Sequence, residues 1–255
     1  MDATRTGRSG GRQHHATRAA FLIAGVGVAA WAPLVPYVKA RLGIDEAALG
    51  ALLLCIGLGS LAAMPATGML VARFGCRTVI LAAGAVFCAV LPFLAILSSL
   101  PAVALALALF GAGLGTLDVA MNIHAVIVER GSTRPLMSGF HGLYSAGGIA
   151  GAGGSSLMLW LGVSPPVATF AIALALAAIL AAAAPHLIRG GPDGPGTPAF
   201  VLPHGIVVLL GALCFVVFLT EGAVLDWGAL LLVGSHGFDT AWGGLGYAVF
   251  AAAMT

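Results

Sequence analysis

Long apolar segments separated by short polar ones cover nearly the whole sequence, and this pattern constrains the fold more than any other feature. Of the 255 residues, 60% are hydrophobic and only 8% are charged, whereas soluble domains carry about 25% charged residues. A membrane-spanning helix needs about 20 predominantly apolar residues, and seven or eight segments of the chain reach that length. The segments are continuously apolar rather than alternating, which excludes a membrane β-barrel. We therefore predict an all-α polytopic membrane protein.

The segments also predict how the chain is divided into parts. We expect helices at 21–38, 47–71, 78–97, 102–128, 137–161, 166–188, 204–233 and, as a partial eighth, 240–255. The predicted parts are a disordered basic tail (1–18), an N-terminal six-helix transmembrane bundle (19–188), a linker rich in proline and glycine (189–203) and the start of a second bundle (204–255). The eighth segment is shorter than a crossing, so the chain is expected to end partway through it.

Arginine and lysine predict the orientation in the membrane. If the N-terminal tail is cytoplasmic, nine basic residues fall on the cytoplasmic side: Arg5, Arg8, Arg12, Arg18, Arg73, Arg77, Arg130, Arg134 and Arg189. Only Lys39 and Arg41 then fall outside. Because cytoplasmic loops carry the excess of basic residues, we predict a multi-pass protein of the cell (inner) membrane with a cytoplasmic N-terminus and linker.

An acidic residue inside the fourth apolar segment gives the first functional hypothesis. Asp118 lies well within that segment, where a charged side chain costs about 2.5–3.5 kcal/mol on insertion scales. It shares one helical face with Gly111, Gly115 and Asn122, because these positions are three or four residues apart. Such a small and polar face is expected to pack on another helix or to line an aqueous cavity. We predict that Asp118 carries a proton and that Asn122 bonds its carboxyl or the substrate.

Four further residues are candidates for binding or proton coupling. His141 in the fifth segment is either a proton carrier or substrate donor, or a structural hydrogen-bonding residue, and the two alternatives are about even. Glu221 is a second membrane-embedded acid. Asp226 and Trp227 could present a carboxylate and an aromatic face to a sugar-like substrate, although an interfacial tryptophan is the more ordinary role for Trp227. His124 lies off the Asp118 face, which favours a structural role.

Several motifs resemble the major facilitator superfamily. In Gly68–Ile80, the residues Gly68, Leu70, Arg73, Gly75 and Arg77 match the conformational loop between helices two and three of that family. The family's acidic position is Ala72 here, and one arginine position is Cys76. Gly113–Asn122 and Arg134–Ala152 are similar to helices four and five of the fucose-permease-like branch, and in that branch an acid at the Asp118 position takes part in proton coupling. Segment 21–38 lacks the acid that the fucose permease pattern has there.

The resemblance implies a secondary transporter that moves a small polar solute by alternating access, coupled to protons, and sugar-like solutes are among the candidates. Two alternatives are a drug or metabolite efflux carrier and an inactive transporter fragment. A membrane enzyme is disfavoured, because the sequence has no HExxH, GxSxG or comparable motif. We expect no cofactor, no metal and no nucleic-acid partner. The expected partners are the solute, protons and the lipid bilayer, and a homodimer is one expected assembly.

Overall fold

The computed structural model describes residues 3–191 and 204–255, and all the regular elements in these ranges are helical. The long helices are α1 (Ala3–Ala29), α3 (Glu46–Ile96), α4 (Leu100–Arg130), α5 (Met137–Trp160), α6 (Pro165–Ala183) and α7 (Ile206–Leu230). The short ones are η1 (Ala32–Leu34), α2 (Val35–Leu42), η2 (Ala184–His186), η3 (Leu231–Ser235), η4 (Thr240–Trp242) and α8 (Leu245–Met254). The prediction of an all-helical chain with several long apolar helices is confirmed. Most of the predicted linker, residues 192–203, lies outside the described residues.

The N-terminal basic segment differs from the prediction. We expected residues 1–18 to be disordered, but α1 begins at Ala3 and continues into the apolar segment without interruption. Adding a residue to an existing helix is far easier than starting one, so a helix anchored by its buried part extends into polar sequence. At its other end α1 stops before Trp31 and Pro33, where η1 and then α2 continue the chain.

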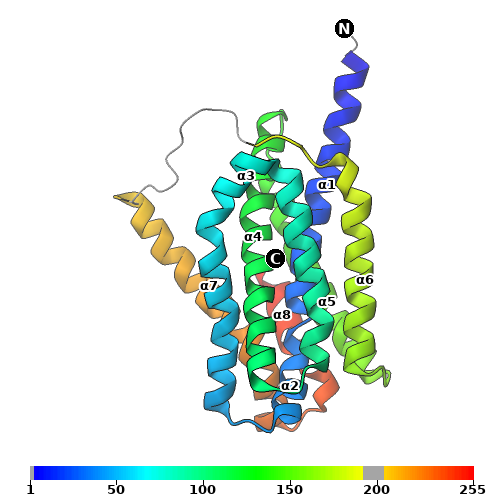
Figure 1. Ribbon diagram of the computed structural model, residues 1–255, viewed down its shortest axis with the longest axis vertical. Coiled ribbons are helices and arrows are strands. Elements are labelled where there is room, and N and C mark those ends of the chain that lie inside the picture. The colour runs from blue at the N-terminus through cyan, green and yellow to red at the C-terminus, as the bar shows by residue number, and fades with distance from the viewer. Residues whose placement is uncertain (1–2, 192–203) are drawn as a thin grey trace.

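The element α3 is two helices joined at Gly75, as the predicted pair 47–71 and 78–97 requires. Gly75 has φ 79° and ψ 157°. This backbone conformation is not helical, and residues other than glycine rarely adopt it. Figure 1 shows the two parts of α3 running in opposite directions, with the turn at one end of the bundle. A Cβ atom at this position would also lie 1.8 Å from the carbonyl oxygen of Arg189.

Five helical segments of the described residues are long and apolar enough to cross a membrane: Gly11–Leu42, Glu46–Ile96, Leu100–Arg130, Pro165–His186 and Ile206–Ser235. The predicted number was seven or eight. One reason for the lower number is that Glu46–Ile96 counts as one segment, although its 51 residues are long enough to cross a membrane twice. Another is α5, whose glycines and serines lower its mean hydropathy. The last is α8, which has only 10 residues.

Glycines bring two pairs of helices into backbone contact. On α5, Gly147 and Gly151 face α1, where an added Cβ at Gly151 would lie 2.3 Å from the carbonyl oxygen of Val26. On α4, a Cβ at Gly111 would lie 2.0 Å from the carbonyl oxygen of Ile56 in the first part of α3. Small residues allow this approach between membrane helices. These glycines therefore serve helix packing.

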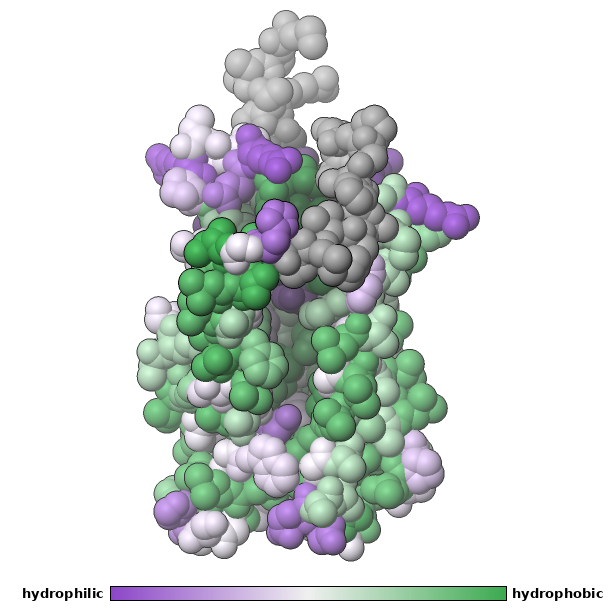
Figure 2. All heavy atoms as spheres, turned by 90° about the vertical axis from the view of Figure 1, so that its left-hand side faces the viewer, coloured by the Kyte–Doolittle hydropathy of each residue, from purple (hydrophilic) through white to green (hydrophobic). Residues whose placement is uncertain are grey.

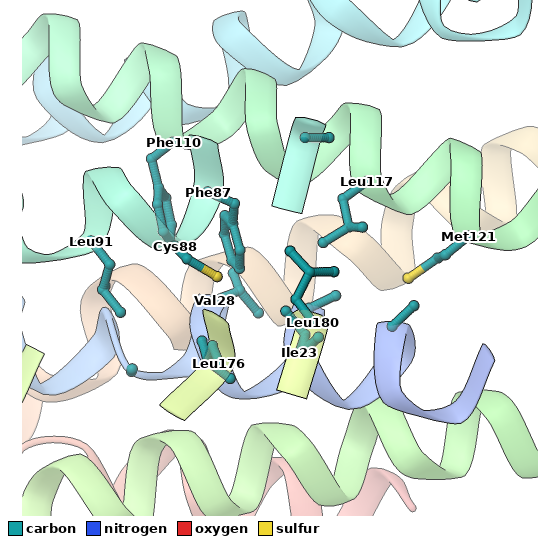
Figure 3. Close-up of a cluster of buried hydrophobic side chains, with 14 of the residues drawn as sticks. Ile23, Val28, Phe87, Cys88, Leu91, Phe110, Leu117, Met121, Leu176 and Leu180 are labelled. Atoms are coloured by element: carbon teal, nitrogen blue, oxygen red, sulfur yellow. The ribbon is translucent and has the colours of Figure 1, made fainter. Parts of the chain in front are cut away.

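Apolar side chains from α1, the second part of α3, α4 and α6 fill the centre of the bundle (Figure 3). Phe87 stacks on Phe110 with ring centroids 4.5 Å apart. Leu176 and Leu180 reach this cluster from α6, and Ile23 and Val28 reach it from α1. The cluster therefore holds together helices that are far apart in the sequence.

By contrast, α7 lies at the edge of the bundle. Residues 204–220 are exposed, whereas most residues from Glu221 to Leu230 are partly buried. The helix contacts α2, η1 and α8. Figure 1 shows its N-terminal end standing away from the other helices. Figure 2 shows the molecule from this side: hydrophobic residues cover its middle, hydrophilic residues gather at both ends, and a few hydrophilic atoms are visible in a recess between hydrophobic surfaces.

Candidate functional site

A cavity of about 500 Å³ lies between α1, the first part of α3, α4, α5 and α7. Its walls combine apolar side chains with polar and ionisable side chains. The polar lining residues are Ser60, Asp118, Asn122, His141, Tyr144 and Glu221. Four of the six predicted site residues therefore share one cavity: Asp118, Asn122, His141 and Glu221.

Asp118 and Asn122 project from successive turns of α4. The Asn122 Nδ2 atom donates to the Asp118 carbonyl oxygen at 2.9 Å and lies 3.3 Å from Asp118 Oδ1. Both side chains are partly buried. The amide therefore orients the carboxyl but does not fully satisfy it, since a carboxylate accepts several hydrogen bonds. Asp118 keeps a free acceptor surface toward the cavity.

The residues of α5 on the cavity are His141 and Tyr144, which are three positions apart and so share a face. The His141 ring contacts Phe21 of α1 edge-on, with centroids 5.1 Å apart. His141 and Glu221 share the cavity with Asp118. The cavity therefore gathers two carboxyl groups and an imidazole.

Glu221 joins the cavity from α7. Its Oε1 atom accepts a hydrogen bond of 3.0 Å from the Tyr247 hydroxyl of α8. Glu221 lies where α7 changes from exposed to partly buried. The bond ties the cavity-lining part of α7 to α8, which in turn packs on α5.

A second opening reaches Asp118 along the surface of α4. It is a groove of about 490 Å³ that runs over Asp118, Asn122, Val126 and Ile127 to Arg130, the last residue of α4. Asp118 is therefore accessible along its own helix from the end that carries Arg130.

The structure does not bring Asp226 and Trp227 into the Asp118 cavity. Trp227 lines a larger cavity of about 1130 Å³ near Tyr37, Lys39 and Thr240. Asp226 lies beside the fully buried Trp31, and neither Asp226 Oδ1 nor Trp31 Nε1 has a hydrogen-bond partner within ordinary geometry. A helix turns by about 100° per residue, so residues five or six positions beyond Glu221 point to other sides of α7.

The predicted conformational loop forms the turn between the two parts of α3. Gly68 and Arg73 are in the first part, Gly75 makes the turn, and Arg77 begins the second part. The Arg73 guanidinium lies 5.1 Å from the ring centre of its neighbour Phe74. The described residues contain no group of three or more His, Cys, Asp or Glu side chains that could hold a metal ion.

Comparison with known proteins identifies the family. The family model of the Major Facilitator Superfamily matches residues 19–255. The chain belongs to this superfamily. It is 55% identical to an uncharacterized MFS-type transporter of Yersinia pestis over 95% of its length, and 33% identical to an uncharacterized transporter of Sinorhizobium fredii over 92%. The membrane protein MosC of Rhizobium meliloti is 30% identical over 92% of the chain.

Membership of the Major Facilitator Superfamily makes this chain a multi-pass membrane protein of a family of non-enzymatic carriers for small molecules. The prediction that it is not an enzyme is thereby confirmed. The chain spans 57–63% of the length of these relatives.

Two candidate functional residues, Tyr144 and Tyr247, were not predicted from the sequence. Tyr144 lines the cavity, and its spacing of three residues from His141 was the available signal. Tyr247 bonds Glu221 from a helix 26 residues further along the chain. Its only signal was a phenol hydroxyl inside an apolar segment, where a buried hydroxyl needs a partner.

Proposed function

We propose that this facilitator is a proton-coupled secondary transporter of a small polar solute, with Asp118 as the proton carrier. The observation that carries the proposal is the cavity in which Asp118, Glu221 and His141 meet. Ionisable residues inside membrane proteins commonly mark ion pathways and proton relays. A carboxyl that is only partly bonded and open to a cavity can take up a proton from one side and release it to another.

The size and lining of the cavity support a small polar solute. A volume of about 500 Å³ lies in the usual range for small-molecule sites, about 300–1,000 Å³. Carboxyl, amide, imidazole and phenol groups can together donate to and accept from several hydroxyls. Apolar side chains such as Met64 and Phe218 line the rest of the cavity. This combination fits a solute such as a sugar, with polar edges and less polar faces.

The same proposal includes the domain plan and the branch. We assign residues 19–188 to a six-helix bundle, 189–203 to a cytoplasmic linker, and 204–255 to the start of a second bundle, with residues 1–18 cytoplasmic and the protein in the inner membrane. The motifs in Gly113–Asn122 and Arg134–Ala152 favour the fucose-permease-like branch. Substrate in such transporters binds between two repeats near the middle of the bilayer, and the Asp118 cavity is formed by segments from both proposed bundles. Trp227 and Asp226 are assigned to the outer side of the pathway.

The test is uptake into proteoliposomes that contain the chain expressed from its own gene. A panel of radiolabelled sugars and small polar solutes is offered with the outside more acidic than the inside. Symport predicts that at least one solute accumulates and that a protonophore abolishes the accumulation. Accumulation driven only by the opposite gradient would indicate an exchanging efflux carrier. The proposal of proton coupling fails if a transported solute equilibrates at the same rate with and without either gradient.

A further inference from the structure

The segment that follows η2 is fastened to the turn of α3. We call residues 187–191 the docking segment. Its Gly190 carbonyl accepts the Cys76 backbone N–H at 3.1 Å, and its Ile188 carbonyl accepts the Arg77 backbone N–H at 3.0 Å. The first N–H groups of a helix have no partner within that helix. The docking segment therefore caps the second part of α3.

His124 of α4 holds the docking segment from the other side. The Ile188 backbone N–H donates to His124 Nε2 at 2.9 Å. Because Nε2 accepts, the ring proton lies on Nδ1, which is 3.1 Å from the Thr17 hydroxyl oxygen of α1. The Thr17 hydroxyl in turn donates to the Gln13 carbonyl at 2.9 Å. His124 and Thr17 are fully buried, so these bonds are shielded from water.

The bonds join into one chain through α1, α4, the docking segment and α3. Tight packing accompanies them at the turn. The Cys76 side chain is fully buried, and a Cβ at Gly75 would overlap the Arg189 carbonyl oxygen. One position at which this turn departs from the family's loop pattern thereby gains an explanation. The fully buried Cys76 side chain leaves no room for a long arginine.

We propose that His124 is a positioning residue that docks the segment after η2 onto the α3 turn, and that this backbone clamp holds the turn in place. The docking segment is then held by hydrogen bonds to both α3 and α4. The clamp needs an acceptor at Nε2 and a donor at Nδ1, which leucine lacks.

The native cysteines report on the clamp. Cys76 is buried and its backbone N–H is bonded to the docking segment, Cys88 is buried in the apolar cluster, and Cys214 is exposed on α7. N-ethylmaleimide labelling of the purified full chain is followed at Cys76, Cys88 and Cys214 by mass spectrometry. In the parent, we expect Cys214 to label faster than Cys76 and Cys88. In His124→Leu the Ile188 N–H loses its partner, and Cys76 should label about tenfold faster because a lost buried bond shifts local opening by that order.

His124→Gln and His15→Gln are the control variants for His124→Leu. Glutamine keeps one acceptor and one donor, so we expect Cys76 of His124→Gln to stay closer to the parent than to His124→Leu. His15→Gln should leave all three rates unchanged. Equal Cys76 rates in the parent and in His124→Leu, or equal rates in the Leu and Gln variants, would overturn the proposal. If His124→Leu also makes Cys88 label faster, the Thr17→Val variant is measured instead. Faster labelling of Cys76 alone in Thr17→Val supports the clamp, and an unchanged Cys76 labelling rate overturns it.

Discussion

Helix α7 is as apolar as the membrane-spanning helices of the central bundle, yet only the bundle is tightly packed. In the bundle, Gly25 of α1 approaches Tyr144 of α5 so closely that an added Cβ would lie 2.1 Å from the Tyr144 carbonyl oxygen. On α7, Gly211 and Gly222 have no atom within 4 Å of an added Cβ. Lipid tails are as apolar as leucine, so apolarity does not bring membrane helices together. Small residues that match a neighbouring backbone decide which helices pack.

The largest difference in stability between the bundle and α7 is expected when one phenylalanine in each is replaced by alanine. Phe87 is 1% exposed and stacks on Phe110, whereas Phe215 of α7 is 66% exposed. Phe87→Ala should lower the free energy of unfolding by about 3–5 kcal/mol, because it leaves a cavity in the cluster of Figure 3. Phe215→Ala should change it little. Both are measured by titrating the detergent-solubilised protein with a denaturing detergent, and equal losses would remove the contrast between the two regions.

Replacing a glycine by alanine is expected to change the free energy of unfolding by a smaller amount, and in opposite directions in the bundle and in α7. Gly25→Ala should lower the free energy of unfolding by about 1–3 kcal/mol, since the new methyl group has to separate α1 from α5. Gly211→Ala should raise it by about 0.5–1 kcal/mol, because alanine favours the helix and meets nothing. The same titration checks both variants. A stabilised Gly25→Ala variant would show that the close contact of α1 with α5 is not needed.

Much of the fold follows from the sequence because apolar length is a strong signal in membrane proteins. The fourth helix was predicted at 102–128 and is Leu100–Arg130, and the fifth was predicted at 137–161 and is Met137–Trp160. The helical course of α1 before the apolar segment was missed, because local composition says little about a helix that extends from a buried anchor.

The candidate site was predictable only in part. Periodicity placed Asp118 and Asn122 on one face, and they do share the cavity. The position of Asp226 beside Trp31 was not foreseen, because it depends on how α7 packs against the start of η1. The partners of His124 were also beyond prediction, since Thr17 and Ile188 are 107 and 64 residues away in the sequence. Long-range hydrogen bonds leave no periodic signal.

The most direct test of the central proposal is gradient-driven uptake by Asp118→Asn. Asparagine has nearly the shape of a protonated aspartic acid and keeps the hydrogen bonding to Asn122, but it cannot release a proton. The account predicts that accumulation under a pH gradient disappears while exchange of labelled for unlabelled solute across the membrane continues. An Asp118→Asn protein that accumulates solute against its gradient as well as the parent does would contradict the role of Asp118 as proton carrier.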